Sequence, residues 1–394
     1  MFPVELPGTK HPVLMWAAER EVEPAALQQL RNIGSLPWVY GVRVMPDVHL
    51  GKGATIGSVI AMPGAVSPAA VGVDLGCGVV GVKTSLTERD LYGLHALRRA
   101  IESAVPVGSN SHRREVDLKR LGLESGMKTF WEGFKDLHAG VQKLRPRALG
   151  QLGTLGSGNH FIEVCVDEAG FVWLTLHSGS RNIGKELAER HIEIARRLPH
   201  NQALADRDLA VFLADTPQMD AYRHDLWWAQ EYAARSRAVM MGLVKEQVSR
   251  HFASANVAYG QSINIHHNYV AEEMIDGRRM LVTRKGAIRA GKSELALIPG
   301  SMGTGSYVVR GRGNEASFQS ASHGAGRRMS RHAALRTYTV ADLAAQTAGV
   351  ESRKDQGIVD EIPEAYKDLY AVIDAQKDLV DVVQHLRTVL CVKG

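Results

Sequence analysis

The sequence predicts an α+β fold, in which helices and strands follow one another in mixed order instead of alternating. Two observations support this. Short apolar runs separated by glycine-rich turns fill the first 85 residues and recur after residue 261, and a helical repeat of apolar residues extends over 216–252. The chain of 394 residues is 45% hydrophobic, and no obvious linker divides it. Length alone would allow two or three domains, although the lack of a linker favours one domain over 1–394.

The other elements are expected in a definite order along the chain. Residues 1–85 predict short strands joined by glycine-rich turns, 87–104 a helix, and 105–150 a basic, loop-like region with some helix. The segment "GFVWLTLHSGSR" predicts a strand that ends in a turn, and "GKELAERHIEIARRL" predicts a helix after it. Short strands are expected again from "SINIHHNYV" to about residue 310, before a mixed final segment that ends in "TVLCVKG".

The region 216–252 has the strongest helical pattern. Pro217 stands near its start, where the N–H that proline lacks would have no helical partner. Apolar side chains recur on one face of the expected helix, namely Tyr222, Leu226, Ala229, Tyr232, Met240, Val244 and Val248. We expect this face to pack against the core.

Composition excludes several classes of protein. The three cysteines, Cys77, Cys165 and Cys391, are too few and too scattered for a disulfide framework. The first 21 residues lack the basic-then-apolar pattern of a signal peptide, and no apolar stretch is long enough to span a bilayer. We therefore expect a cytoplasmic protein without a membrane segment.

Two short motifs fit nucleotide-binding patterns but lack the required context. "GAIRAGKS" matches the P-loop pattern, yet "ELALIPGSMG" follows it and leaves no room for the helix whose N-terminus would face the phosphates. "GCGVVG" matches the dinucleotide-binding pattern, yet the next residues, "VKTS", indicate a strand. Neither segment is predicted to bind a nucleotide in the usual way.

Basic residues concentrate in the segment 284–331. This segment has nine Lys and Arg residues against two acids, an excess of seven, whereas the whole chain has a net charge of +5. The nine are Arg284, Lys285, Arg289, Lys292, Arg310, Arg312, Arg327, Arg328 and Arg331. A solvated basic face would explain them, and so would a site for phosphates or nucleic acid, because guanidinium groups bind phosphates bidentately.

The run "VGVDLGCGVV" places Asp74 and Cys77 among glycines and aliphatic residues. Alone, the thiol would be a small buried hydrophobe and the carboxylate a turn cap. Three histidines change this interpretation, because each adjoins an apolar, strand-like run and a small or polar residue: His160, His177 and His267. Thiolate, imidazole and carboxylate together suit Zn, Mn, Fe or Co better than Mg or Ca. Five such ligands exceed what one tetrahedral ion needs, so two ions could share the thiolate, with the glycines allowing the backbone to approach them.

A second group of residues has the chemistry of a nucleophile. In "SASHGAGRRMSRH", His323 precedes Arg327 and Arg331. The segment could be a basic surface loop. Alternatively, an unprotonated imidazole can attack a phosphoryl centre while arginines and a divalent metal stabilise the charge that develops.

A series of segments resembles, in order, the motifs of the RtcB family of RNA ligases: "MPDVHLGKGATIG", "VGVDLGCG", "LGSGNHFIEV", "HSGSRNIG", "HHNYV", "RKGAIRA", "IPGSMGTGSYVVRG", "SHGAGRRMSR" and the terminal "VKG". The resemblance extends from about residue 40 to the last residue, and "VLMWAAEREVEPAALQQL" is similar to the compact bacterial branch. It implies a single RtcB-like domain, with glycine-rich sheets around a central cleft for metal and nucleotide, flanked by helices.

The activity that the resemblance implies is ligation dependent on GTP and Mn²⁺. Such enzymes join an RNA 3′-phosphate or 2′,3′-cyclic phosphate to a 5′-hydroxyl, in tRNA splicing or RNA repair. His323 would attack the α-phosphate of GTP and then transfer GMP to the RNA 3′-phosphate. The 5′-hydroxyl would finally displace the GMP. The implied alternative is a paralogue that caps 3′-phosphates of RNA or DNA without sealing them. The resemblance also names archease as a candidate accessory protein, and we expect a monomer.

The resemblance also implies roles for individual residues. Two Mn²⁺ ions, with Cys77 bridging them, would be held by Asp74, Cys77, His160, His177 and His267. GTP or GMP would contact Asn159 and Asn268 through its phosphates, and Glu163, Ser306, Tyr366 and Lys393 around guanine. The phosphates of RNA or nucleotide would be bound by Arg181, Lys285, Arg327 and Arg331. Asp47 and His49 fall in another matched motif and are expected to line the site.

Overall fold

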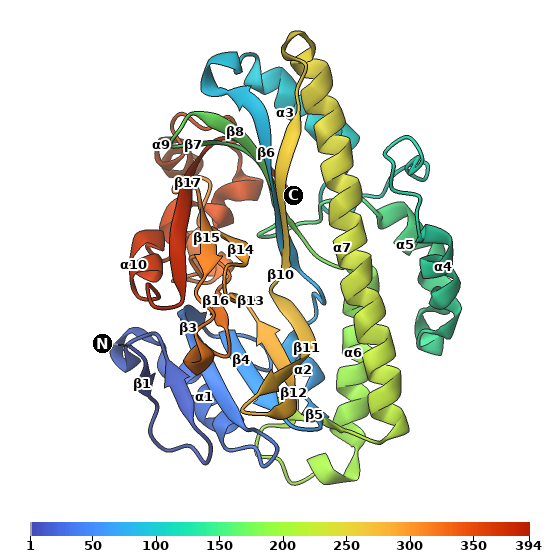
Figure 1. Ribbon diagram of the computed structural model, residues 1–394, viewed down its shortest axis with the longest axis vertical. Coiled ribbons are helices and arrows are strands. Elements are labelled where there is room, and N and C mark those ends of the chain that lie inside the picture. The colour runs from blue at the N-terminus through green and yellow to red at the C-terminus, as the bar shows by residue number, and fades with distance from the viewer. Residues whose placement is uncertain (1) are drawn as a thin grey trace.

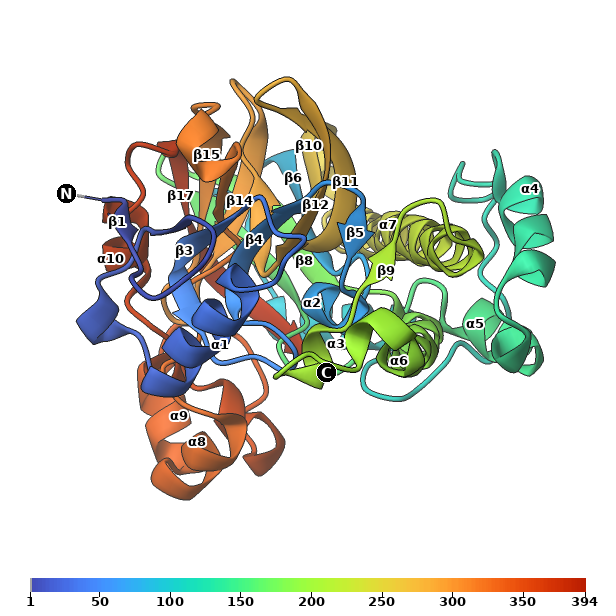
Figure 2. The ribbon, with the colours of Figure 1, turned by 90° about the horizontal axis from the view of Figure 1, so that it is seen from below.

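The computed structural model describes residues 2–394 and has the mixed α+β architecture that the sequence predicts. Two large sheets form its centre, with α7 (Pro217–His251) running along one side of them (Figure 1). Figure 2 shows α4 (Met127–Glu132) and α5 (Arg145–Gln151) outside α7, on the side away from the sheets. The single-domain organisation stays a prediction.

The larger sheet is antiparallel throughout and has seven strands. In spatial order they are β10 (Tyr259–His266), β6 (Gly78–Thr87), β8 (Phe171–Ser178), β7 (Phe161–Asp167), β17 (Val380–Lys393), β15 (Ser306–Gly311) and β14 (Leu295–Pro299). The last strand in the sequence, β17, therefore lies inside the sheet, between β7 and β15.

The smaller sheet has six strands, and only the pair β2 and β3 is parallel. In spatial order they are β1 (Val4–Glu5), β2 (Val13–Met15), β3 (Gly41–His49), β4 (Ile56–Met62), β12 (Arg278–Lys285) and β11 (Asn268–Ile275). Two short pairs complete the strands: β13 (Ala287–Arg289) with β16 (Ser320–Ser322), and β5 (Ala65–Val66) with β9 (Phe212–Leu213). Because β10 belongs to one large sheet and β11 to the other, the chain passes between the sheets at His267.

The long helix confirms the sequence pattern. Pro217 occupies the first turn, and the Thr216 hydroxyl accepts a hydrogen bond from the Met219 N–H at 3.2 Å, which caps the helix. All seven apolar residues predicted for the inward face are buried. The remaining helices are α1 (Pro24–Gly34), α2 (Pro68–Val71), α3 (Leu94–Ala104), α6 (Arg181–Arg197), α8 (Arg331–Thr337), α9 (Val340–Gln346) and α10 (Leu369–Asp374).

Two predictions of elements need correction. The first 85 residues contain α1 and α2 as well as strands, because Leu27, Leu30 and Ile33 recur at helical spacing and bury one face of α1. The helix predicted for 87–104 begins only at Leu94. Residues Glu88–Asp90 form a separate 3-10 turn, and Gly93, with φ of 58°, separates that turn from α3. The predicted region 105–150 is loop with short helices, as expected.

No helix within residues 2–394 combines the length and apolar character needed to cross a membrane.

Candidate active site

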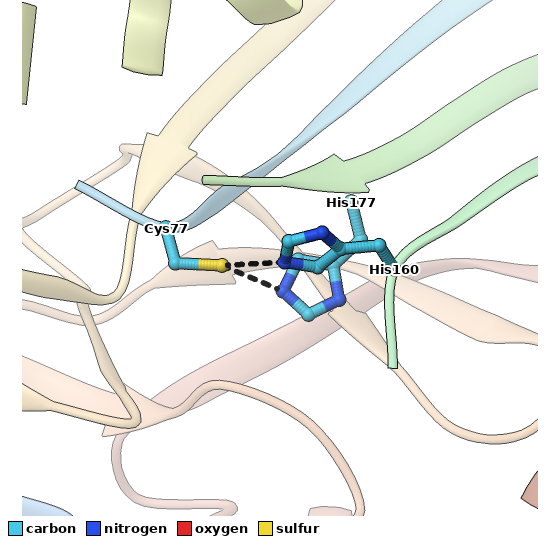
Figure 3. A group of neighbouring side chains, drawn as sticks. All are labelled: Cys77, His160 and His177. Atoms are coloured by element: carbon cyan, nitrogen blue, oxygen red, sulfur yellow. Dashed lines mark hydrogen bonds between the residues drawn. The ribbon is translucent and has the colours of Figure 1, made fainter. Parts of the chain in front are cut away.

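Three of the five predicted metal ligands meet where strands of the larger sheet end. The Cys77 Sγ lies 3.2 Å from the His177 Nε2 and 3.5 Å from the His160 Nε2 (Figure 3). Strand pairing explains the meeting, since Gly78 on β6 pairs with Ser178 on β8, and His177 pairs with the first residue of β7. All three side chains are buried and their ligand atoms lie within 4.8 Å of one another.

The hydrogen bonds of the two histidines leave their Nε2 atoms free for a cation. The His160 Nδ1 lies 2.9 Å from the Leu155 carbonyl oxygen, and the His177 Nδ1 lies 3.2 Å from that of Asn159. A carbonyl only accepts, so each Nδ1 donates and each Nε2 points toward Cys77, where its lone pair would bind a metal ion. Burial also lowers the pKa of His177 well below its usual range, which keeps the ring neutral.

Asp74 and His267 complete the predicted set. The Asp74 Oδ2 lies 3.1 Å from the His160 Nε2, and the His267 Nε2 lies 3.2 Å from the His177 Nε2. Burial raises the pKa of Asp74, but its contacts with His160 and the Ser180 N–H outweigh burial and hold the pKa at about 2. Burial likewise raises the pKa of the Cys77 thiol, so a cation bound there would displace its proton. This donor set fits a transition-metal ion.

The glycines near these ligands allow close packing of the chain. A Cβ on Gly179 would lie 2.0 Å from the Asp74 Oδ1, so only glycine lets that carboxylate approach. A Cβ on Gly76 would lie 2.7 Å from the Cα of Gln230 on α7. These glycines therefore allow close packing against Asp74 and against the long helix. The sequence had suggested a different role for glycines here, which was to let the backbone approach the ions.

His323 lies beside the metal ligands and is oriented by Asp47. The two residues are 276 positions apart, but β16, which leads to His323, lies close to β3, which carries Asp47. The Asp47 Oδ2 accepts from the His323 Nδ1 at 2.6 Å and from its backbone N–H at 3.2 Å. The His323 ring centroid is 4.9 Å from that of His267. With Nδ1 donating, the Nε2 of a neutral His323 keeps its lone pair for a reaction.

Two cavities meet at His323 and Asn159, which line both of them. The first has a volume of about 310 Å³ and contains most residues predicted for GTP: Asn159, Glu163, Ser306, Tyr366 and Lys393, together with His49, Arg327 and Arg331. The second has a volume of about 350 Å³ and is lined by three of the five predicted metal ligands, Asp74, Cys77 and His267, together with Asn268 and Lys285. Pockets of this size hold small-molecule ligands.

Glu361 organises the far end of the first cavity and was not predicted from the sequence. Its buried carboxylate accepts hydrogen bonds from Lys393 and Tyr366 at 2.6 Å each, from Arg327 at 3.2 Å, and from Arg331. No local motif marks Glu361, because it stands in an ordinary acidic stretch, "VDEIPEAY". The Glu361 carboxylate therefore holds together four side chains that the sequence predicted as separate site residues.

The other predicted phosphate-binding residues differ in their settings. Lys285 is buried, donates to the carbonyls of Lys52 and Ala69, and has its pKa lowered by burial to about 8. Asn268 uses its side chain on the backbone, with Nδ2 donating to the Asp74 carbonyl at 3.4 Å.

Arg181 does not line either cavity. It donates to the Thr154 Oγ1 at 3.0 Å and to the Gly108 carbonyl at 2.7 Å. The structure therefore brings every predicted phosphate-binding residue except Arg181 to the two cavities.

The sequence motifs that were set aside have ordinary structural roles. Lys292 and Ser293 are followed by strand β14, not by a helix, and "GCGVVG" runs into β6. The basic segment is not one solvated face, because Arg284 is fully buried and bonded to Glu273, while Arg289 pairs with Glu294.

Comparisons with known proteins agree with this geometry. The family model described as tRNA-splicing ligase RtcB matches residues 29–394. The RNA-splicing ligase RtcB of Escherichia coli K12 is 46% identical over 407 aligned residues, which cover 97% of each chain. The tRNA-splicing ligase RtcB of Pyrobaculum aerophilum is 32% identical, covering 98% of this chain and 96% of that relative. The chain therefore belongs to the RtcB family of RNA ligases.

Proposed function

We propose that this RNA ligase uses GTP and Mn²⁺ to join RNA 3′-phosphate or 2′,3′-cyclic phosphate ends to 5′-hydroxyl ends, in tRNA splicing or RNA repair. One observation carries the proposal. His323, oriented by Asp47, stands at the junction of two cavities and next to His267, beside the buried group of Cys77, His160 and His177 that could hold a metal ion. We assign the nucleotide to the first cavity and the RNA ends to the second, which contains Lys285, so a group carried on His323 would be within reach of both.

The reaction can be written as three displacements that balance. The His323 Nε2 lone pair forms a bond to the α-phosphorus of GTP, and the bond to the β-phosphate oxygen breaks to release pyrophosphate. An oxygen of the RNA 3′-phosphate then takes the GMP, and the P–N bond breaks. Finally the 5′-hydroxyl oxygen attacks the RNA phosphorus, its proton is lost, and GMP leaves. A 2′,3′-cyclic phosphate must first be opened by water to the 3′-phosphate.

In this proposal Asp74, Cys77, His160, His177 and His267 would hold two Mn²⁺ ions, and the Cys77 thiolate would serve both. The central position of the Cys77 Sγ, within 3.5 Å of two imidazole nitrogens, supports the shared role. When bound, such ions neutralise crowded phosphate oxygens and favour in-line attack. The protein itself supplies a buried, preformed donor set and the orientation of His323.

The nucleotide in this proposal occupies the first cavity. Glu163, Ser306, Tyr366 and Lys393 would surround guanine there, and the phosphates would extend to Asn159, which lines both cavities, and to Asn268 in the second. Arg327, Arg331, Lys285 and Arg181 would bind phosphates of the nucleotide or of RNA. We further propose a cytoplasmic monomer, with archease as the accessory protein to add when turnover is measured.

The test is a pair of assays on the purified protein. Incubation with Mn²⁺ and GTP labelled at the α-phosphate should give a covalent protein label that is labile in acid and stable in alkali, as a phosphoramidate is. Addition of a 3′-phosphate RNA strand and a 5′-hydroxyl strand should then yield a joined product. A capped 3′ end that persists while the 5′-hydroxyl strand is untouched would favour the capping alternative. No covalent label on folded, metal-loaded protein would contradict both.

Asp47→Asn should slow guanylylation by about 10²-fold, the size of effect expected when a group that orients a catalytic imidazole loses its charge. The amide keeps an oxygen for the His323 Nδ1 but no longer fixes which ring nitrogen carries the proton. Single-turnover labelling measures the rate. Metal affinity should stay at the wild-type value, and a labelling rate equal to the wild type would contradict the role of Asp47.

The KM for GTP should fall as pH rises from about 6 to 8. Burial raises the pKa of Glu163 to about 7, so the side chain is mainly protonated at pH 6 and ionised at pH 8. Only the carboxylate accepts from both donors on the guanine edge. The same raised pKa means that this group favours folding of the free protein at low pH and that this contribution is lost as pH rises through about 7. In Glu163→Gln the pH dependence of KM should disappear, and its persistence there would assign it to another group.

A further inference from the structure

Arg237 on α7 is buried directly behind the metal-ligating cluster. Its side chain is 0% exposed, and none of the ion pairs formed within residues 2–394 includes it. Burial lowers its pKa to about 10, so the guanidinium stays charged at neutral pH. A buried charge without a carboxylate partner is costly, and proteins keep one where its hydrogen bonds do specific work.

The side chain of Arg237 contacts the chain next to three proposed ligands. Its Nη1 donates to the carbonyls of Gly76 at 2.7 Å and Ser178 at 3.1 Å, which adjoin Cys77 and His177. Its Nη2 also lies 3.2 Å from the Nδ1 of His266, which adjoins His267, but this Nδ1 donates to the Gly76 carbonyl at 2.8 Å and does not accept from Arg237. The guanidinium can only donate, and its planar fork holds the two carbonyls at fixed spacing.

A third hydrogen bond of Arg237 and a glycine complete the arrangement. The Arg237 Nε donates to the Asn264 Oδ1 on β10 at 3.1 Å. A Cβ on Gly78 would lie 3.0 Å from the Arg237 Cζ and 2.0 Å from the Ile265 carbonyl oxygen. The glycine after Cys77 therefore leaves the space that the guanidinium and β10 occupy.

We infer that Arg237 is a positioning residue of the metal centre, which holds β6, β8 and β10 at the spacing that Cys77, His177 and His267 need to bind metal together. The long helix thus acts on the site through the Arg237 side chain, although that side chain forms no hydrogen bond to a metal-ligating atom. The inference rests on the proposed metal site, but its test measures metal binding without GTP or RNA. Groups that orient metal ligands in this way typically affect affinity by about 10- to 100-fold.

The experiment compares Arg237→Lys with Arg284→Lys. Lysine keeps the charge and loses the fork at both positions, and both arginines are fully buried. The partners of Arg284, which are Tyr269, Glu273, Phe318 and Ser320, do not adjoin a proposed ligand in the chain. Co²⁺ is titrated into the metal-free proteins and followed by the thiolate-to-cobalt charge-transfer band, and melting temperature is measured without metal.

We expect Arg237→Lys to weaken Co²⁺ binding by about 10- to 100-fold, and Arg284→Lys to keep the wild-type affinity within about twofold while it also lowers the melting temperature. Equal affinity in wild type and Arg237→Lys would overturn the inference, and so would an equal loss in Arg284→Lys. If Arg237→Lys does not fold, Asn264→Ala serves in its place, because it removes one exposed acceptor of Arg237. This variant should weaken Co²⁺ binding by about fivefold, the free energy of one hydrogen bond. Unchanged Co²⁺ affinity in Asn264→Ala would overturn the inference. A wild-type protein without the band would overturn the metal site itself.

Discussion

His323→Ala should abolish covalent labelling by GTP and reduce ligation by at least about 10⁴-fold, as expected when a nucleophile is removed. In the structure, His323 is the imidazole that Asp47 orients at the junction of the two cavities. The histidines of the metal cluster cannot replace it, because their Nε2 atoms face Cys77 or one another. Labelling with GTP carrying a labelled α-phosphate, followed by denaturation, measures the effect.

The matched control for His323→Ala is His385→Ala, on β17. His385 is half-buried, its Nε2 contacts the Thr304 carbonyl and its ring packs on Tyr307, and it lines neither cavity, so its loss should leave labelling at the wild-type level. Both variants should bind Co²⁺ like the wild type, which shows that the metal site is intact. Label retained by folded His323→Ala would mean that a different side chain carries the nucleotide.

Cys77→Ala should lower metal affinity by at least about 10³-fold and remove ligation with it, because the change deletes a ligand and not a group that orients one. The Cys77 Sγ contacts both His160 and His177, so its loss removes the ligand atom next to both imidazoles. Metal should raise the melting temperature of the wild type but not of the variant, since only a protein that binds metal in its folded state gains stability from it.

The control for Cys77→Ala uses another buried cysteine of the same sheet. Cys165, on β7, contacts Glu163 and two threonines at 3.9 Å and no metal-ligating side chain. Cys165→Ala should keep the thiolate-to-cobalt band that Cys77→Ala loses. A band that survives in Cys77→Ala would assign the bound metal to a different site.

The parts of the site that the sequence predicted are those with a local signature. His160 and His177 stand next to strand-like runs and small residues, and strand pairing is enough to bring them together. The long helix was predictable because its apolar period continues through nearly ten turns. The helix α1 was missed although its period is also local, since the glycine-rich turns around it favoured strands.

The residues that the sequence did not reveal act through distant contacts. Arg237 has no local feature that separates it from a surface arginine of α7, and only the fold places its fork beside Gly76 and Ser178. Glu361 is one of several acids in its segment, and its partners Lys393 and Arg327 come from other elements. The role of Asp47 likewise depends on a contact across 276 residues. No pattern within a short window encodes such pairs.

The position of β17 inside the larger sheet has a consequence for how the polypeptide reaches its native state. β7 has one neighbour, β8, from nearby in sequence, whereas its other neighbour, β17, begins only at Val380. Until that strand arrives, β7 presents an open edge, and open edges recruit other chains during synthesis. Pairings of such sequence separation also form slowly. The strands β6, β8 and β10 can assemble earlier, so the part of the sheet next to Cys77 and His177 would form before the part next to Lys393. Nascent chains would be most prone to aggregation between these two stages.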